Sequence, residues 1–425
     1  MIRHLQLWDF KNFENADLEV GPFTVILGIN ASGKSNIRDA FRFLHGVGRG
    51  YSIAEIIGGK YGAGGQSEWA QMRGAASEII RFGEDSFQLE VTLELLGRKF
   101  VYSILIEQRT ARARRTFFIG YEQLEVDGIE IYTNLPGSDD PVEHPKHPDM
   151  LDLRMAKTGN QRRRGARVSV RSDQPALTQL PDQRGVTRAH KDLCEEVIEV
   201  LGSIRFLDLS PELMRKAAFP GQTVLGDNGE NLPTVLQGIC ADTDRKNVLA
   251  EWISELTPMD VIDFKFPVDF NGTIQLVLVE RNGAEVSSNS ASDGTLRFLA
   301  MLAALLGDNP AKLYFFEELD NGIHPARLRL MLDLIEAQTG KGEVQVITTT
   351  HSPEFLSMVG DATFEYSSVV FRAHGANSAD VTRLNSFPNI AKLRETQGLG
   401  SLHSSGWMED MVEIMAPPMA EERPS

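Results

Sequence analysis

The chain has 425 residues, of which 42% are hydrophobic and 24% are charged, and its formal net charge is −16. This length allows one to three domains with a sizeable core, and the acidic balance argues against a protein coated in nucleic acid. Its two cysteines, Cys194 and Cys240, provide neither a metal cluster nor a disulfide framework. The longest apolar run, Phe298–Leu306, has nine residues, about half of what a membrane span needs. We therefore expect a cytoplasmic protein without a membrane partner.

The first expected elements are strands over Ile2–Phe10 and Phe23–Leu27, and the second strand runs directly into the motif G-x-x-x-x-G-K-S at Gly28–Ser35. An apolar strand before this motif and a helix after it form the context in which it binds phosphate. Its glycines let backbone N–H groups point inward, and the helix N-terminus favours negative charge. Lys34 reaches the β- and γ-phosphates, and the Ser35 hydroxyl takes a position on Mg²⁺. The chain has no N-K-x-D guanine motif, so we expect ATP with Mg²⁺.

The next elements form a meander of strands. Phe87–Leu95 alternates apolar and polar residues, the period of a half-buried strand, and Phe100–Glu107 and Phe117–Val126 are expected to follow as its neighbours. Residues 133–186 are rich in polar residues and proline, which predicts a mobile loop or a weakly ordered insertion. Within it, Arg154–Arg171 holds seven Lys or Arg residues and no acid. This cluster is either a DNA contact, or a solvated basic loop that pairs with the acidic remainder of the chain. The candidate DNA contacts are Arg162, Arg163, Arg164 and Arg167.

Helices are expected to resume over Thr187–Leu201, Asn231–Ala241 and Arg245–Leu256, followed by a strand over Thr273–Val279 between two Asn-Gly turns. The sequence Ser-Asp-Gly-Thr then precedes an apolar helix, Leu296–Leu306. Ser292 or Asp293 suits the N-cap of this helix. A helix N-terminus beside a glycine is either an anion site or only a capped helix, and the local sequence leaves both readings open.

Two later strands are expected to end in polar residues. The apolar run Leu313–Phe316 is followed by Glu317 and Glu318, and Val344–Thr348 is followed by a segment that contains His351. The carboxyl ends of strands in α/β folds are where ligands bind. We therefore expect Glu318 and His351 to lie at the same edge of one sheet, with Pro325 starting the helix between the two strands.

Taken together, these motifs resemble an ABC-type ATPase head, and more narrowly the RecF/SMC/OLD-like branch, often described as AAA-family ATPases. The resemblance covers about residues 1–130 and 200–360. The segments that carry it are Leu7–Phe13, the phosphate loop followed by Asn36, Ser292–Thr295, which resembles the signature loop, Phe316–Pro325 and Thr349–Pro353. Ser35 and Ser292 are separated by 257 residues, far more than is typical of a transporter subunit, and no heptad run of coiled-coil length fills the gap.

The resemblance implies an α/β fold, with a RecA-like mixed sheet and flanking helices, an antiparallel β-subdomain, and an inserted helical or loop region. We expect residues 1–130 to form the first part of the ATPase head and residues 131–260 an insertion. Residues 261–400 would complete the head, and residues 401–425 would be a tail.

The resemblance also implies a mechanism in which two heads sandwich two ATP molecules. The residues around ATP would be Gly28, Asn30, Ala31, Ser32, Gly33, Lys34, Ser35 and Asn36. Ser292, Gly294 and Thr295 of one subunit would touch the γ-phosphate that Lys34 of the other subunit holds, and Asp320 would be a second cross-subunit contact. Glu318 would be the general base and His351 the γ-phosphate sensor. Ser35 and Glu317 would hold Mg²⁺, although Glu317 stands where the family usually has aspartate. Gln71 and Gln108 are two candidates for the family's Q-loop glutamine.

We expect a homodimer or higher homo-oligomer that uses ATP to control a DNA-related activity in anti-phage defence or DNA repair. OLD-like proteins carry a C-terminal Toprim nuclease, but only 72 residues follow Pro353 here and they contain no D-x-D. A stand-alone ATPase with a separately encoded, nuclease-like effector is therefore expected. The alternatives are an ATP-gated scaffold or sensor with little turnover, and the ATPase subunit of a transporter, which the long spacing before Ser292 disfavours.

Overall fold

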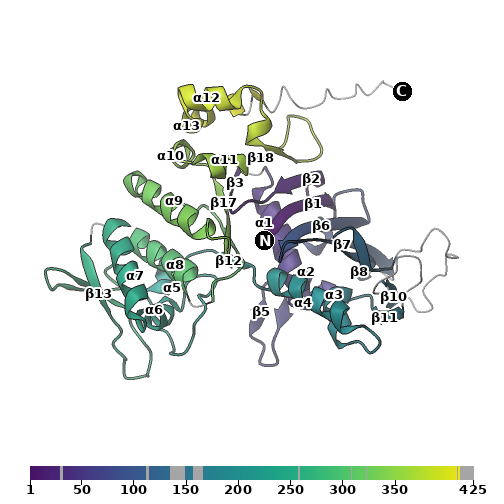
Figure 1. Ribbon diagram of the computed structural model, residues 1–425, viewed down its shortest axis with the longest axis horizontal. Coiled ribbons are helices and arrows are strands. Elements are labelled where there is room, and N and C mark those ends of the chain that lie inside the picture. The colour runs from purple at the N-terminus through teal and green to yellow at the C-terminus, as the bar shows by residue number, and fades with distance from the viewer. Residues whose placement is uncertain are drawn as a thin grey trace.

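The computed structural model describes residues 1–28, 32–111, 114–134, 149–156, 166–256, 259–307, 309–321, 323–408 and 410–411. A six-stranded, mainly parallel sheet stands between a group of helices on one side and an eight-stranded antiparallel sheet on the other (Figure 1). In spatial order, the six strands are β12 (Arg205–Leu207), β16 (Leu313–Phe316), β17 (Gln345–Thr350), β3 (Phe23–Leu27), β18 (Ser368–Phe371) and β19 (Asp380–Arg383). The expected mixed sheet with an antiparallel β-subdomain is therefore confirmed.

The parallel sheet is buried on both faces, which explains why its strands are continuous apolar runs. All five residues of β3 are buried. Phe23, Val25 and Leu27 belong to the core shared with the helices, whereas Ile26 belongs to the core shared with the antiparallel sheet. Because strand side chains alternate in direction, one short apolar strand supplies both cores. The helices on this side are α6 (Leu232–Cys240), α7 (Thr243–Leu256), α8 (Asp293–Leu306), α9 (Pro325–Thr339) and α10 (Pro353–Ser357).

The eight-stranded sheet contains the predicted meander. Phe87, Leu89, Val91 and Leu93 are buried and the residues between them are only partly buried, which confirms the alternation. In spatial order, its strands are β11 (Arg167–Arg171), β10 (Met150–Met155), β9 (Ile129–Thr133), β8 (Arg114–Val126), β7 (Arg98–Ala111), β6 (Ser86–Leu95), β1 (Ile2–Phe10) and β2 (Phe13–Glu19). The core on this side also includes side chains of α1 (Lys34–Gly48), α2 (Ile53–Gly58), α3 (Ala176–Gln179) and α4 (Arg188–Gly202).

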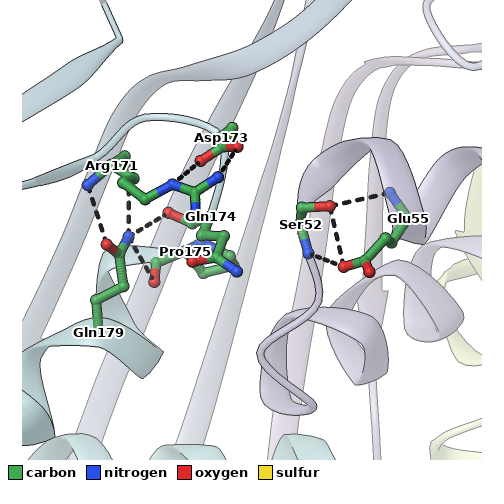
Figure 2. A network of polar contacts seen from close by, with 7 residues as sticks. All are labelled: Ser52, Glu55, Arg171, Asp173, Gln174, Pro175 and Gln179. Atoms are coloured by element: carbon green, nitrogen blue, oxygen red, sulfur yellow. Dashed lines mark hydrogen bonds and ion pairs between the residues drawn. The ribbon is translucent and has the colours of Figure 1, made fainter. Parts of the chain in front are cut away.

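The prediction of a mobile loop or a weakly ordered insertion over residues 133–186 is wrong where the structure describes β10, β11 and α3. β10 and β11 pair with each other and extend the sheet. Arg171 forms an ion pair with Asp173, and the Gln179 amide donates to Arg171 O and Gln174 O, at 3.0 and 2.8 Å (Figure 2). Beside this network, Ser52 and Glu55 form a capping box at the start of α2 (Figure 2). Both strands alternate buried apolar residues with more exposed polar residues, so the average composition of the segment did not reveal them.

The later elements agree closely with expectation, with one exception. The helices expected over Thr187–Leu201, Asn231–Ala241 and Arg245–Leu256 are α4, α6 and α7. The strand expected over Thr273–Val279 is wrong in its bounds, because Ile274 makes only isolated bridges. The regular strands of this region are β13 (Val261–Lys265), β14 (Val277–Glu280) and β15 (Glu285–Ser287). Residues 131–260 supply β10 and β11 to one sheet and β12 to the other.

The remaining elements complete the chain. They are β4 (Lys60–Tyr61), β5 (Ser67–Trp69), α5 (Pro211–Met214), α11 (Asp361–Glu365), α12 (Ile390–Gln397) and α13 (Leu399–Ser404). The last two helices form a layer beyond α10 at the top of the molecule (Figure 1). Within the described residues, no helix has the length and apolar character that a membrane crossing requires.

A buried histidine connects α1 to α4. His45 Nδ1 lies 3.0 Å from Leu201 O. Burial lowers the pKa of His45 to about 4; the hydrogen bond with Leu201 opposes this shift, and the positive charges of Arg205, Arg49 and Arg42 add to it. His45 is therefore neutral in the folded protein at pH values where it is partly charged in the unfolded chain.

We predict that the free energy of unfolding falls as the pH drops from 6.5 towards 4. The unfolded chain binds a proton at His45 over this interval and the folded chain does not, which costs about 1.4 kcal/mol per pH unit. His45→Gln should flatten the pH profile measured by urea denaturation, whereas the exposed-site control His374→Gln should leave it unchanged. An equally steep profile in His45→Gln would contradict the assignment.

Candidate nucleotide-binding site

Four strand ends and the segments after them surround one cavity of about 470 Å³, which we call the strand-end cavity. The strands β12, β16, β17 and β3 are parallel neighbours, so their carboxyl ends lie at the same edge of the sheet. The polar residues that line the cavity include Ser32, Lys34, Ser35, Asn36, Arg73, Asp208, Arg297, Glu317, Glu318, Asn321 and Thr349.

The phosphate loop needs glycine at two described positions. Gly28 has a φ of 152°, and a Cβ atom there would lie 2.3 Å from Val370 O. Gly33 has a φ of 120°, and a Cβ atom there would lie 2.9 Å from the side chain of Asn12. Both are left-handed conformations with no room for a side chain. Asn30 and Ala31 lie outside the described residues.

Asn12, in the turn between β1 and β2, contacts Ser32 of this loop and Asn36 in the first turn of α1. Its amide donates to Ser32 O at 3.3 Å, and the Asn36 amide donates to Asn12 Oδ1 at 2.6 Å. Asn12 belongs to the first motif that carries the resemblance, yet sequence reasoning gave it no role in the site. Through these two hydrogen bonds, Asn12 connects the antiparallel sheet to the phosphate loop and the start of α1.

Lys34 and Ser35 begin α1 and face the strand-end cavity. The first turn of α1 carries no acidic residue, so its positive N-terminal partial charge is not offset there. The Lys34 ammonium donates to Gly28 O. Burial lowers the pKa of Lys34, and the negative charge of Glu318 opposes this shift. This corner of the cavity therefore suits an anion.

Glu317 is held by an arginine that the sequence analysis did not identify. Arg73 donates to Glu317 Oε1 from Nη1 at 2.8 Å and to Oε2 from Nη2 at 2.6 Å, and Arg38 Nε lies 3.7 Å from Oε1. Burial raises the pKa of Glu317, but the hydrogen bonds from Arg73 and the charges of Arg38 and Arg73 outweigh it, so the pKa is lowered. Glu317 is therefore an ionised carboxylate with both oxygens occupied.

Glu318 and His351 come together at the ends of β16 and β17. His351 Nδ1 lies 3.5 Å from Glu318 Oε1, and the side chains are 55% and 43% exposed. Glu318 has a φ of 48°, which is uncommon for a residue with a side chain, and its N–H donates to Thr349 Oγ1 at 3.1 Å. Backbone strain of this kind is often found at functional sites.

Asp320 is engaged within its own chain. Thr350 Oγ1 donates to Asp320 Oδ1 at 3.0 Å. Burial raises the pKa of Asp320, and its hydrogen bonds with the backbone and with Thr350 oppose the shift. Asp320 therefore links the loop after β16 to the end of β17.

The signature loop does not reach the cavity of its own chain. Ser292 Oγ accepts from Thr295 N at 3.1 Å and caps α8. Among the described residues that line the strand-end cavity, Ser292, Gly294 and Thr295 are absent, and α8 contributes only later residues such as Arg297. Within one chain, the signature loop therefore does not line the cavity that the phosphate loop lines.

Other expected residues lie elsewhere. Neither Gln71 nor Gln108 is among the described residues that line the cavity. Asp208, which directly follows the edge strand β12, does line it. Arg162, Arg163 and Arg164 lie outside the described residues. Arg167 lies on β11 opposite Arg154 of β10, away from the cavity lining.

The donor groups around the cavity fit Mg²⁺. The Ser35 hydroxyl and the carboxylates of Glu317, Glu318 and Asp208 are hard oxygen ligands. In the described part of the chain, no group of three His, Cys, Asp or Glu side chains is arranged to hold a metal ion. Mg²⁺ commonly keeps several water ligands and needs few protein ligands. Arg73 must leave Glu317 before that carboxylate can serve the ion.

Comparisons with known proteins agree with this geometry. Residues 23–357 match the family model described as "AAA domain, putative AbiEii toxin, Type IV TA system". An "ATP/GTP phosphatase" of Helicobacter pylori is 22% identical over 370 residues, which cover 84% of this chain and 87% of that protein. The matched range spans the phosphate loop, the signature loop, Glu318 and His351.

Two further similarities are more limited. "DNA replication and repair protein RecF" of Gloeobacter violaceus is 32% identical over 122 residues, which cover 28% of this chain and 26% of that protein. The crystal structure of an SMC head bound to the C-winged helix domain of ScpA covers 90% of this chain and 96% of that chain, at 14% identity and a TM-score of 0.47.

We predict that Asn12→Ala weakens nucleotide binding. The substitution removes two hydrogen bonds on the phosphate-loop segment, each worth about 1 kcal/mol, so affinity should fall by at least roughly fivefold. Isothermal titration calorimetry with a non-hydrolysable ATP analogue measures the change. Asn15→Ala, on the exposed face of β2, is the matched control. Equal dissociation constants for the two variants would contradict a role for Asn12 in holding the phosphate loop for nucleotide binding.

Proposed function

Because the chain is an ATPase that belongs to the family described as "AAA domain, putative AbiEii toxin, Type IV TA system", we propose that it works as an ATP-driven homodimer. Each of two heads would bind ATP in its strand-end cavity. The signature loop of the opposite head would close that cavity, and hydrolysis would release the two heads.

The observation that carries this proposal is the juxtaposition of Glu318 and His351 beside Lys34. Glu318 lines the cavity together with Lys34, and His351, which is not among the described lining residues, approaches Glu318 to 3.5 Å. In this proposal, Lys34 and the N-terminus of α1 bind the phosphates, and Glu318 accepts a proton from the attacking water. His351 senses the γ-phosphate. Phosphoryl transfer depends mainly on such positioning and charge stabilisation.

Ser35 and Glu317 would hold Mg²⁺ in this cavity. When bound, the ion offsets the charge of the phosphate oxygens. Glu317 is already ionised, so it needs to lose no proton to take this role, but it must exchange its contact with Arg73. The exchange would replace the single positive charge of Arg73 with the double charge of Mg²⁺.

The position of the signature loop supports action on a second subunit. The loop lies at the start of α8, outside its own cavity. A cavity closed by its own chain would leave these residues without a role in nucleotide chemistry. In the proposed dimer, Ser292 and Gly294 would present hydroxyl and backbone N–H groups to the partner's γ-phosphate. Thr295 is buried and its N–H donates to Ser292 Oγ, so it would act by holding that cap.

We predict that Glu318→Gln retains ATP binding, slows hydrolysis by about 10²–10⁴-fold and accumulates an ATP-bound dimer. The amide keeps the size of the side chain but cannot accept the proton. Light scattering after size-exclusion chromatography, with and without ATP, measures the dimer, and phosphate release measures turnover. Glu343→Gln, at an exposed position before β17, is the matched control. A Glu318→Gln protein that stays monomeric at saturating ATP would contradict the sandwich.

We further propose that dimerisation controls a separately encoded, nuclease-like effector in anti-phage defence or DNA repair, with DNA as a candidate ligand. The family description names a toxin, and one relative is named as a replication and repair protein. The basic cluster over residues 154–171, of which Arg167 is a described member, is the candidate DNA contact.

A second function, an ATP-gated scaffold with little turnover, is favoured by one observation. Arg73 occupies both oxygens of Glu317, so the ion pair competes with Mg²⁺ for the carboxylate. If this competition limits the enzyme, turnover should be slow in the natural protein and should rise in Arg73→Ala at low Mg²⁺. The matched control is Arg81→Ala, which breaks the ion pair with Asp9 outside the cavity lining. Fast turnover in the natural protein, together with slower turnover in Arg73→Ala, would contradict the scaffold function.

A further inference from the structure

The signature loop carries an acid where the proposed function needs an anion to bind. Asp293 is the first residue of α8, and its side chain is 65% exposed. A helix N-terminus attracts phosphate through its partial positive charge and its unpaired N–H groups. A carboxylate at this position offsets that charge and repels a triphosphate. The loop therefore needs a cation that neutralises Asp293.

Arg215, directly after α5, supplies that cation. Its Nη2 atom lies 2.6 Å from Asp293 Oδ1 and 2.9 Å from Ala291 O. In return, Ser288 Oγ donates to Arg215 O at 3.2 Å. One residue thus contacts the segment before α8 at three points, and it holds both the charge and the backbone of that segment. With 26% exposure, the Arg215 side chain is much less solvated than its partner.

The segment that carries Arg215 begins in the strand-end cavity. Asp208 and Leu209 follow β12 and line the cavity, and α5 follows immediately. Backbone hydrogen bonds fix this segment, with Asp208 N donating to Asp227 O at 2.8 Å and Ser210 N donating to Asn228 O at 3.0 Å. Arg215 itself is not among the described residues that line the cavity. It therefore contacts the signature loop and not the nucleotide of its own chain.

We propose that Arg215 is a positioning residue for the signature loop. It neutralises Asp293 and fixes residues 288–293, so that the N-terminus of α8 can receive the triphosphate held by the partner subunit. This inference rests on the proposed ATP sandwich. It adds a residue that works for the opposite active site, 78 positions before Asp293 in the sequence.

Substitutions at Arg215 and Asp293 distinguish the neutralisation of charge from a role in packing. Arg215→Ala leaves Asp293 ionised and unneutralised at the helix N-terminus, so ATP-dependent dimerisation should weaken by at least tenfold. Arg215→Lys keeps the charge but loses the planar guanidinium whose Nη2 atom reaches both oxygens, so the weakening should be smaller than in Arg215→Ala. Adding Asp293→Asn to Arg215→Ala removes the repelling charge and should restore part of the lost dimer affinity. A role confined to packing predicts no such rescue.

The experiment uses the full chain in the Glu318→Gln background, where the ATP-bound dimer is expected to accumulate. Sedimentation velocity over a concentration series measures the dimer dissociation constant with and without ATP. A fluorescent ATP analogue, titrated into dilute protein, measures ATP affinity of the monomer, which Arg215→Ala should leave unchanged. Arg281→Ala is the matched control, because it breaks another exposed ion pair, with Asp260, at the turn between β14 and β15.

Each outcome is decisive. If the parent does not dimerise with ATP, the proposed function fails and the role of Arg215 fails with it. If the parent dimerises and Arg215→Ala dimerises equally well, the positioning role alone is overturned. It is also overturned if Arg215→Ala weakens ATP binding by the monomer to the same extent, or if Asp293→Asn restores nothing. Loss in Arg215→Ala with rescue by Asp293→Asn, and no change in Arg281→Ala, supports it.

Discussion

The parallel pairing of β12, β16, β17 and β3 is the constraint on which the rest of the structure depends. Parallel neighbours end at the same edge, so residues from four distant parts of the chain are delivered to one cavity. Burial on both faces makes the register hard to change, because a shift by one residue would exchange the two cores that Tyr314 and Phe315 supply. The positions of Glu318 and His351 therefore follow from apolar packing beneath them.

Much of the fold was predictable because its signals are local. The phosphate loop lies beside its own strand and helix, and β16 and β17 each carry their polar residues directly after the apolar run. Arg73 was not predictable, since it meets Glu317 across 244 positions and lies in a segment of short strands and turns. β10 and β11 were missed for a different reason, since their short alternating runs, Met150–Met155 and Arg167–Arg171, lie within a segment whose overall composition is polar.

The charges that line the cavity are balanced, although the chain as a whole is acidic. A net charge of −16 would repel a triphosphate on average, whereas the lining has three cations, Lys34, Arg73 and Arg297, beside three carboxylates, Asp208, Glu317 and Glu318. Glu317 forms an ion pair with Arg73, and Arg38 Nε lies 3.7 Å from the same carboxylate. The same principle recurs at α8, where Arg215 offsets Asp293. In both places an ion pair satisfies a charge whose functional partner would be a ligand.

The helix α8 connects these two places physically. At its start, Asp293 contacts Arg215, whose segment begins at Asp208 in the cavity; one turn later, Arg297 Nη1 donates to Asn321 O at 3.1 Å, in the loop that follows Glu318. These contacts connect the cavity, α5, the start of α8 and the loop after β16 to one another. A displacement of either cavity segment must stretch a hydrogen bond to α8 or move the helix. In the proposed dimer, the N-terminus of α8 would face the partner's nucleotide, and these contacts would then connect one head's cavity to the other head's site.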